Sequence, residues 1–123
     1  MLTPYGVPLI INDRVDVALA ADADGVHVGQ SDMLYEMVKR LLPEGKIIGL
    51  SVESPEQVLE ANNYDLDYVA ASPVFSTTTK TNTIVEWGLD GLRWIRSVSR
   101  HPLVAIGGIH SNNVASICKA GAD

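Results

Sequence analysis

Side chains that can bind a metal ion follow two of the apolar runs of this chain, directly after each run ends. Asn12 and Asp13 come after the first run, and Gln30 and Asp32 come after the second. Carboxylate and amide oxygens are hard ligands of the kind that Mg²⁺ prefers, and Mg²⁺ commonly takes only one or two protein carboxylates while water and substrate phosphate fill its other positions. Asp13 and Asp32 therefore predict a magnesium site, with Asn12 beside it.

A second set of residues could hold anionic ligands. Thr77 and Thr79 can donate hydrogen bonds, and the Lys80 ammonium group can neutralise a phosphate. Gly107-Gly108 stands ahead of a predicted helix, where glycine lets a ligand approach the backbone and N–H groups attract anions. The metal, the lysine and the glycine turn together indicate two phosphate-bearing groups, or a diphosphate and a phosphate.

Alternating strands and helices would have to position these side chains. Apolar or β-branched runs predict five strands, at residues 8–11, 26–28, 46–52, 68–71 and 103–106. A helical pattern follows each strand, and after the fourth strand it is preceded by a long polar stretch, 76–86. The clearest helix start is Ser54-Pro55, with Gln57 three residues after the cap.

Helix capping is the main alternative for the two aspartates. Asp13 and Asp32 each stand where a cap belongs, and taken singly each is more often a cap than a metal ligand. Ser31 is a second candidate cap for the helix after Asp32, and Ser111 is the expected cap of the last helix, 113–120. The apolar residues whose spacing marks the first helix are Val15, Ala18 and Leu19, and those that form one stripe on the second are Leu34, Met37, Val38 and Leu41.

The other candidates have structural alternatives as well. Ser51 can be only a polar residue near the end of a strand, and 77–80 only a solvated loop. Gly107-Gly108 can be a tight turn between strand and helix. A functional site is favoured over these structural alternatives because all the candidates fall at one end of the predicted sheet. Three further residues are expected to be structural. His27 is expected to be an interior histidine, and Trp87 and Trp94 are expected to pack a helix on the sheet.

Five strands, each followed by a helix, predict a parallel α/β sheet with right-handed crossovers. No Gly-x-Gly-x-x-Gly motif opens a helix, so a TIM (β/α)8 barrel is favoured over a dinucleotide-binding fold. A closed barrel usually needs ~250 residues, so we expect residues 1–123 to form one incomplete barrel domain of about five βα units. The pair Ala23-Asp24 before a strand recurs at Ala122-Asp123, which suggests further segments, or a partner chain, that cover the sheet edges.

Composition narrows the function classes. The chain has a formal net charge of −6, which argues against non-specific nucleic-acid binding and leaves phosphorylated small molecules as the expected partners. Cys118 is its one cysteine, so no intramolecular disulfide forms and a reducing compartment is compatible. No apolar run approaches the length of a membrane span, and the first residues lack the pattern of a secretory signal. The expected location is the cytosol.

Four stretches in this order and at this spacing resemble thiamine phosphate synthase: LIINDR at 9–14, GVHVGQSD at 25–32, PVFSTTTK at 73–80 and VAIGGI at 104–109. The family is a (β/α)8 barrel, and the chain resembles its third to seventh units. The resemblance implies a transferase that joins hydroxymethylpyrimidine diphosphate to hydroxyethylthiazole phosphate, releases diphosphate and forms thiamine phosphate. In the family the C–O bond to diphosphate breaks first, and the thiazole nitrogen then captures the pyrimidine-methyl cation.

The resemblance also gives each candidate residue a role. Asp13 and Asp32 correspond to the Mg²⁺ ligands, Mg²⁺ being the implied cofactor. The residues that correspond to pyrimidine-diphosphate contacts are Asn12, Ser51 and Lys80. Those that correspond to thiazole-phosphate contacts are Thr77, Thr79 and, through its backbone, Gly108. The residues expected to act in catalysis are Ser51 and Lys80, the lysine because it stabilises the departing diphosphate.

Two departures from the family leave alternatives open. The Gln-x-Arg-x-Lys strand that binds diphosphate in the family has no counterpart here, and neither does the eighth strand. One alternative is the related thiazole tautomerase, although Glu53 stands where that relative carries a histidine. The other is a catalytically inactive fragment of a larger or fused synthase.

Overall fold

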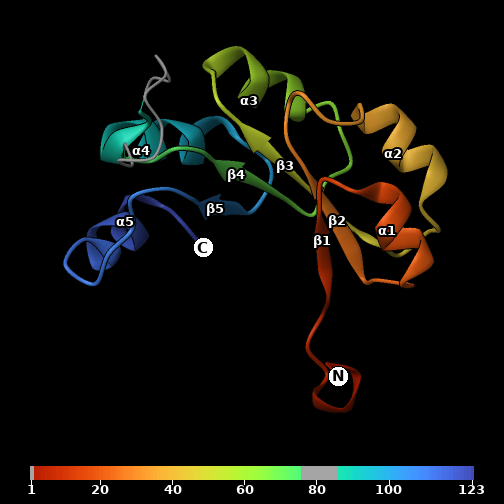
Figure 1. Cartoon of the computed structure of the whole chain (residues 1–123). Coiled ribbons are helices and arrows are strands. Elements are labelled where there is room, and N and C mark those ends of the chain that lie inside the picture. Colours follow the sequence, from red (N-terminus) through yellow and green to blue (C-terminus); the bar gives the residue numbers. More distant parts are fainter. Residues whose placement is uncertain (1, 76–85) are drawn as a thin grey trace. The chain divides into compact units, whose positions relative to one another are not determined.

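Helices and strands alternate along the chain in the computed structural model, which describes residues 2–75 and 86–123 (Figure 1). The strands among these residues are β1 (Ile10–Asn12), β2 (Gly25–Val28), β3 (Ile47–Val52), β4 (Tyr68–Ala71) and β5 (Leu103–Ala105). The helices, after a 3₁₀ turn at Thr3–Tyr5, are α1 (Val15–Ala20), α2 (Tyr35–Leu41), α3 (Pro55–Ala61), α4 (Gly88–Val98) and α5 (Val114–Ala120). The predicted alternation of five strands with helices is confirmed. The chain divides into two compact units, Met1–Leu50 and Ser51–Asp123.

The first unit is a parallel sheet with short helices. β1 pairs with β2 and β2 with β3, in a register that places Val26 opposite Ile48. Both of these side chains are buried, as are Val28 of β2, Val15 of α1 and Val38 of α2. Branched apolar side chains therefore form the core at which the helices pack on the strands.

The helices predicted from the apolar spacing are present as α1 and α2, and their apolar stripes are only partly buried. α1 buries Val15 and Ala18 and leaves Leu19 42% exposed. α2 buries Val38, whereas the other members of its stripe, Leu34, Met37 and Leu41, are 64%, 49% and 47% exposed. α2 has seven residues and so makes about two turns.

Neither α1 nor α2 is capped by a side chain. Arg14 and Leu34 occupy their N-cap positions, and neither side chain makes a capping hydrogen bond. The Asp32 carboxylate instead accepts a hydrogen bond of 2.7 Å from the N–H of Gly29, so it closes the loop after β2. The predicted capping roles are therefore wrong for Asp13, Ser31 and Asp32.

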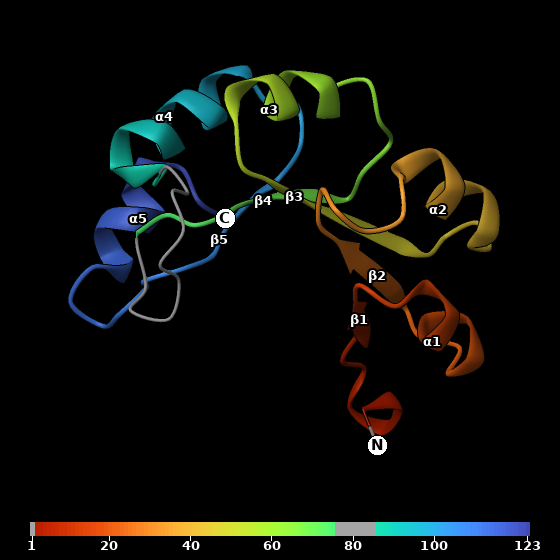
Figure 2. The ribbon, with the colours of Figure 1, turned by 45° about the horizontal axis from the view of Figure 1, so that its top comes forward.

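The second unit continues from the end of β3. The Ser72 N–H donates to the Val52 carbonyl at 3.2 Å, and β4 pairs in parallel with β5 so that Ala70 lies opposite Val104. α3 lies beside α4, and α4 lies beside α5 (Figure 2). The largest fully buried side chains of the second unit belong to Val52, Val58, Val69, Val74, Leu92, Ile95 and Leu103.

Two helix starts in this unit were predicted, and one of them is confirmed. The Ser54 hydroxyl accepts from the Gln57 N–H at 3.3 Å, and the Gln57 side chain accepts from the Glu53 N–H at 2.7 Å. Those reciprocal bonds satisfy N–H groups at the start of α3. Ser111 is not the cap of α5, because Asn113 occupies that position.

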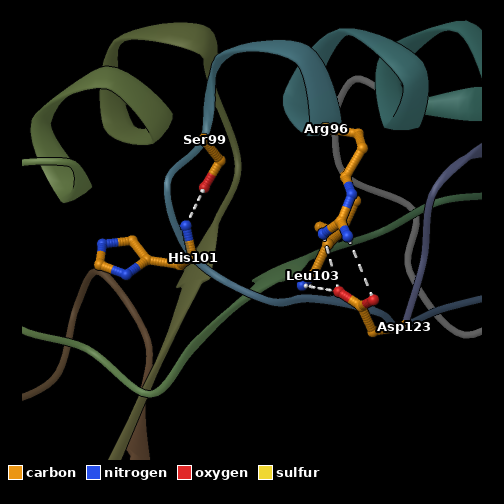
Figure 3. Close-up of polar contacts among 5 residues, drawn as sticks. All are labelled: Arg96, Ser99, His101, Leu103 and Asp123. Atoms are coloured by element: carbon orange, nitrogen blue, oxygen red, sulfur yellow. Dashed lines mark hydrogen bonds and ion pairs between the residues drawn. The ribbon is translucent and has the colours of Figure 1, made fainter.

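The aspartate before a strand plays the same part at two places. The Asp24 carboxylate accepts from the Leu9 N–H at 2.6 Å, and the Asp123 carboxylate accepts from the Leu103 N–H at 2.9 Å. At each place the aspartate's own N–H donates back to that same partner residue, at 2.8 and 2.7 Å. Asp123 also binds the Arg96 guanidinium at 2.8 and 3.3 Å (Figure 3). The recurrent sequence pattern thus marks a side chain that fixes the start of the preceding strand.

Trp87 ties the start of α4 to β3. Its indole N–H donates to the Val52 carbonyl at 3.0 Å, and its ring stacks on Trp94 with 6.4 Å between ring centroids and 11° between the planes. Among residues 2–75 and 86–123, none of the helices combines the length and the apolar character needed to cross a membrane.

Candidate functional site

Asp13 sits at a sharp turn immediately after β1. Its N–H donates to the His27 carbonyl at 2.8 Å, and the Arg14 N–H donates back to the Asn12 carbonyl, also at 2.8 Å. This turn holds Asp13 at a φ of 69°, in the left-handed region that few residues other than glycine adopt. Such a conformation costs about 1–3 kcal/mol and persists where the surrounding structure imposes it, often at functional sites.

Asp32 folds back onto the end of β2. Besides the bond from the Gly29 N–H to its carboxylate, the Asp32 N–H donates to the Gly29 carbonyl at 3.2 Å. A Cβ at position 29 would lie 3.2 Å from the Asp32 carboxylate oxygen, a distance that favours glycine there. The loop after β2 therefore holds the carboxylate in a defined place.

The two carboxyl groups meet, as the sequence predicted for residues that follow neighbouring strands. A hydrogen bond with the Asp32 carboxyl raises the pKa of Asp13, and desolvation and the negative charge of Asp32 raise it further. His27 opposes this shift. The pKa of His27 is itself lowered by burial, against the pull of both aspartates, which favours a neutral imidazole near pH 7. A shared proton or a bound cation would lower the repulsion between the two carboxylates.

The donor set fits Mg²⁺. Two carboxylates supply oxygen ligands only, and Mg²⁺ needs no more than one or two of these from a protein. In the part of the chain that the structure describes, no cluster of three or more acidic, histidine or cysteine side chains forms a fuller metal cage. Asp13 and Asp32 therefore suit an ion whose other ligands are water and phosphate rather than a closed structural site.

Gly107 and Gly108 form a turn that excludes side chains. Both have positive φ values, 102° and 68°. A Cβ would lie 2.9 Å from that of Pro73 at the first position and 2.7 Å from that of Phe75 at the second. The Phe75 N–H donates to the Gly107 carbonyl at 3.1 Å, which holds the two segments together. Only glycine fits this close approach.

Three consecutive N–H groups at this turn are available to a ligand. Within residues 2–75 and 86–123, no protein atom accepts a hydrogen bond from the N–H of Gly107, Gly108 or Ile109. Successive N–H groups of this kind form concave sites for anions. The turn therefore presents three N–H donors that suit an anion.

Asn113 is a residue that the sequence reasoning missed. Its side-chain N–H donates to the Gly108 carbonyl at 3.0 Å, and its side-chain oxygen accepts from the His110 N–H at 2.8 Å. The preference of asparagine for helix starts could have indicated it, since it directly precedes α5. Ser111 was chosen from the same preference.

The other predicted residues belong to the second unit, Ser51–Asp123. Ser51 is half-buried in β3, inside the second unit. The predicted residues that lie outside the described ones are Thr77, Thr79 and Lys80. Among the described residues on either side of them, the Trp87 N–H donates to the Pro73 carbonyl at 3.0 Å.

The described cavities lie away from these candidates. One of about 440 Å³ lies in the first unit before β1, β2 and β3, with Asp24 and Lys46 in its lining. Another, also of about 440 Å³, lies in the second unit before β5 and includes Arg96, His101 and Asp123, which Figure 3 shows. Both are at the amino ends of strands, whereas the active sites of barrels of this type lie at the carboxyl ends.

Comparison with known proteins gives a consistent result over the whole chain. A family profile described as thiamine monophosphate synthase matches residues 1–123. The thiamine-phosphate synthase of Albidiferax ferrireducens is 53% identical over 123 residues, which are 100% of this chain and 56% of the relative. That of Vibrio parahaemolyticus is 52% identical over 98% of this chain and 59% of its own length.

A solved structure and a fused protein extend the comparison. A thiamine phosphate pyrophosphorylase from Pyrococcus furiosus superposes with a TM-score of 0.87 at 43% identity, over 98% of this chain and 57% of that one. A probable bifunctional thiamine biosynthetic enzyme from Oryza sativa is 51% identical over 94% of this chain and 21% of its own length. The chain thus spans a little more than half of the single-function relatives, and its barrel is partial.

Proposed function

The chain belongs to the thiamine monophosphate synthase family, and from this we propose that it contributes the central βα units of an enzyme that makes thiamine phosphate. The substrates would be hydroxymethylpyrimidine diphosphate and hydroxyethylthiazole phosphate. The observation that carries the proposal is the meeting of the Asp13 and Asp32 carboxyl groups, from the segments after β1 and β2. A pair of like charges held together in this way is stable with a proton or a cation between them.

Mg²⁺ bound to Asp13 and Asp32 would supply electrostatic stabilisation of the diphosphate leaving group. The chain's own part in this is to hold the two carboxylates in place, through the turn at Asp13 and the bonds between Gly29 and Asp32. Asn12, at the end of β1, is proposed to contact the pyrimidine diphosphate beside them. The neutral form of His27 adds no competing positive charge.

The proposed roles in the second unit follow from the family motifs. Ser51 and Lys80 would contact the diphosphate and act in catalysis, the lysine by neutralising charge on the leaving group. Thr77, Thr79 and the backbone of Gly108 would bind the thiazole phosphate. The free N–H groups of the Gly107-Gly108 turn support the last assignment.

The reaction then needs no covalent participation of the protein. The C–O bond between the pyrimidine methylene and diphosphate breaks, and diphosphate leaves with the electron pair. The thiazole nitrogen provides the electron pair for the new C–N bond. The residues of this chain act by holding the two substrates and by stabilising the negative charge that develops on the leaving group.

Further barrel segments, or another chain, would complete the site. Val104 and Ile106, alternate residues along β5 and just after it, are 37% and 41% exposed. Alternate residues of a strand point to the same face, so an apolar face of β5 is left to be covered. The cytosol is the proposed location, with Cys118 as a free thiol.

The test is a completed barrel, in which residues 1–123 replace the matching segment of the Albidiferax ferrireducens relative. We expect Mg²⁺-dependent formation of thiamine phosphate from the two substrates, with one diphosphate released for each product. The same assay on the 123-residue chain alone is expected to give no product. A folded completed barrel without synthase activity would contradict the proposed function.

A further inference from the structure

We propose that Asn113 is a positioning residue for thiazole-phosphate binding, because it fixes the turn whose N–H groups face the phosphate. This inference rests on the proposed function, in which the Gly108 backbone contacts that phosphate. It adds a residue that neither the family motifs nor the substrate assignments above include.

The Asn113 side chain acts on the turn and not on its own helix. Asn113 occupies the N-cap position of α5, yet its side chain makes no capping hydrogen bond to that helix. Both of its polar atoms point back along the chain, to the Gly108 carbonyl at 3.0 Å and the His110 N–H at 2.8 Å. A residue at a helix start whose side chain serves the preceding loop is engaged in holding that loop.

Asn113 gives the turn an attachment beyond the one that Phe75 provides. Gly107 and Gly108 have no side chains, and glycine loses more conformational freedom on ordering than any other residue. The Phe75 N–H donates to the Gly107 carbonyl. Asn113 binds the carbonyl of the next residue, Gly108.

The side chain of Asn113 also decides which groups remain free for the ligand. Asn113 engages the carbonyl of Gly108, whose oxygen would repel a bound anion, and it accepts from the N–H of His110. The N–H groups of Gly107, Gly108 and Ile109 keep no partner in the described part of the chain. Ordering them before the ligand arrives lowers the entropic cost of binding.

The test uses Asn113→Ala and Asn113→Asp in the completed barrel. Asn113→Ala removes both hydrogen bonds, whereas Asn113→Asp keeps an acceptor for the His110 N–H and loses the donor to Gly108. Each neutral hydrogen bond contributes about 0.5–1.5 kcal/mol, so we expect the KM for thiazole phosphate to rise by roughly fivefold to tenfold in both variants. The KM for pyrimidine diphosphate, and kcat at saturation, should stay within about twofold of the parent.

Asn112→Ala and Asn112→Asp are the matched controls, because Asn112 is exposed and one residue away. They should leave both KM values unchanged, which removes helix propensity and added charge as explanations. Hydrogen exchange measured by mass spectrometry on residues 106–113 gives a readout independent of activity. It should become faster in Asn113→Ala and stay unchanged in Asn112→Ala.

The outcomes separate this inference from the function on which it rests. If the parent completed barrel makes no thiamine phosphate, the proposed function fails and the role of Asn113 fails with it. If the parent is active and the Asn113 variants keep the parent KM for thiazole phosphate, only the positioning role is overturned. A loss of melting temperature with both KM values unchanged would likewise reduce Asn113 to a structural residue.

Discussion

The carboxyl groups of Asp13 and Asp32 lie close enough to interact, and hydrogen bonding to Asp32 raises the pKa of Asp13 above its ordinary value. The two residues come from the segments that follow β1 and β2, a neighbouring parallel pair. Because two negative charges in contact repel each other, a proton or a cation between the members of this pair lowers that repulsion. A cation that occupies the pair has to displace the proton, which makes metal binding dependent on pH.

Mg²⁺ affinity of the completed barrel should therefore rise with pH through the raised pKa of Asp13, and binding on the acid side should release a proton. Titration calorimetry in two buffers of different ionisation enthalpy measures that release. Asp13→Asn should lower the affinity at least about tenfold and abolish the proton release. Asp16→Asn is the control, since Arg14 lowers the pKa of Asp16 to about 2 and that carboxylate is charged throughout. Equal proton release in the parent and in Asp13→Asn would contradict this account.

Asp32→Ala should abolish Mg²⁺-dependent diphosphate release while the completed barrel stays folded. A group that stabilises charge in the transition state commonly contributes about 100- to 1000-fold to kcat. Diphosphate release can be followed with a coupled phosphate assay, and folding by circular dichroism. Asp90→Asn changes a carboxylate that pairs with Arg93 on α4, and it should leave turnover unaltered. Turnover at the parent rate in Asp32→Ala would remove Asp32 from the metal site.

Gly108→Ala should destabilise the completed barrel more than Gly45→Ala does. Both positions have positive φ, so each substitution carries about 1–2 kcal/mol of backbone strain. At Gly108 the new methyl group would also lie 2.7 Å from the Phe75 Cβ, whereas nothing lies within 4 Å at Gly45. Overpacking adds typically about 1–3 kcal/mol. Urea unfolding of the two variants measures the difference, and equal loss of stability would show that the turn can move away from Phe75.

Acid should weaken the second unit through Asp123. The hydrogen bond from the Leu103 N–H, helped by the Arg96 charge, lowers the pKa of Asp123 from its ordinary value of 3.8. The stabilisation is therefore fully present above 3.8 and is lost as the pH falls through the lowered pKa of the folded state. Urea unfolding of the completed barrel from neutral to acid pH should show a shallower acid loss in Asp123→Asn than in the parent. Identical slopes would show that this carboxylate titrates alike in the folded and unfolded states.

The 123-residue chain on its own should self-associate. Val104 and Ile106 leave an apolar face at β5 exposed, and an uncovered sheet edge or face recruits other chains. Analytical ultracentrifugation over a range of concentrations measures the association. A monomer with a sharp, cooperative melting transition would contradict this expectation.

The sequence predicted the local elements better than their packing. The strand Tyr68–Ala71 and the Ser54 cap are found as predicted, because both depend on neighbouring residues alone. The apolar spacing predicted α2 but not its burial, because periodicity marks an apolar face without saying how much of it the rest of the molecule covers. Likewise the Asp32 carboxylate binds the Gly29 N–H instead of a helix start, a choice made by the path of the loop.

The part of the candidate site that could be predicted consists of residues that follow neighbouring parallel strands, because the carboxyl ends of such strands lie at the same edge of a sheet. This argument placed Asp13 and Asp32 at neighbouring strand ends, and their carboxyl groups do meet. Asn113 could not be found in the same way, because its partners are backbone atoms whose positions depend on the fold of the turn. The metal-binding roles of Asp13 and Asp32 stay predictions, and so do the roles of Asn12, Ser51, Thr77, Thr79, Lys80 and Gly108.

The short piece of chain at residues 73–75 is hydrogen-bonded to two other parts of the second unit. The Trp87 N–H donates to the Pro73 carbonyl and the Gly88 N–H to the Val74 carbonyl, while Phe75 is bound to Gly107. Residues 73–75 therefore hold the start of α4 and the glycine turn after β5 together. A substitution that displaces this short piece would accordingly be felt at the helix and at the turn alike, although the two lie far apart along the chain.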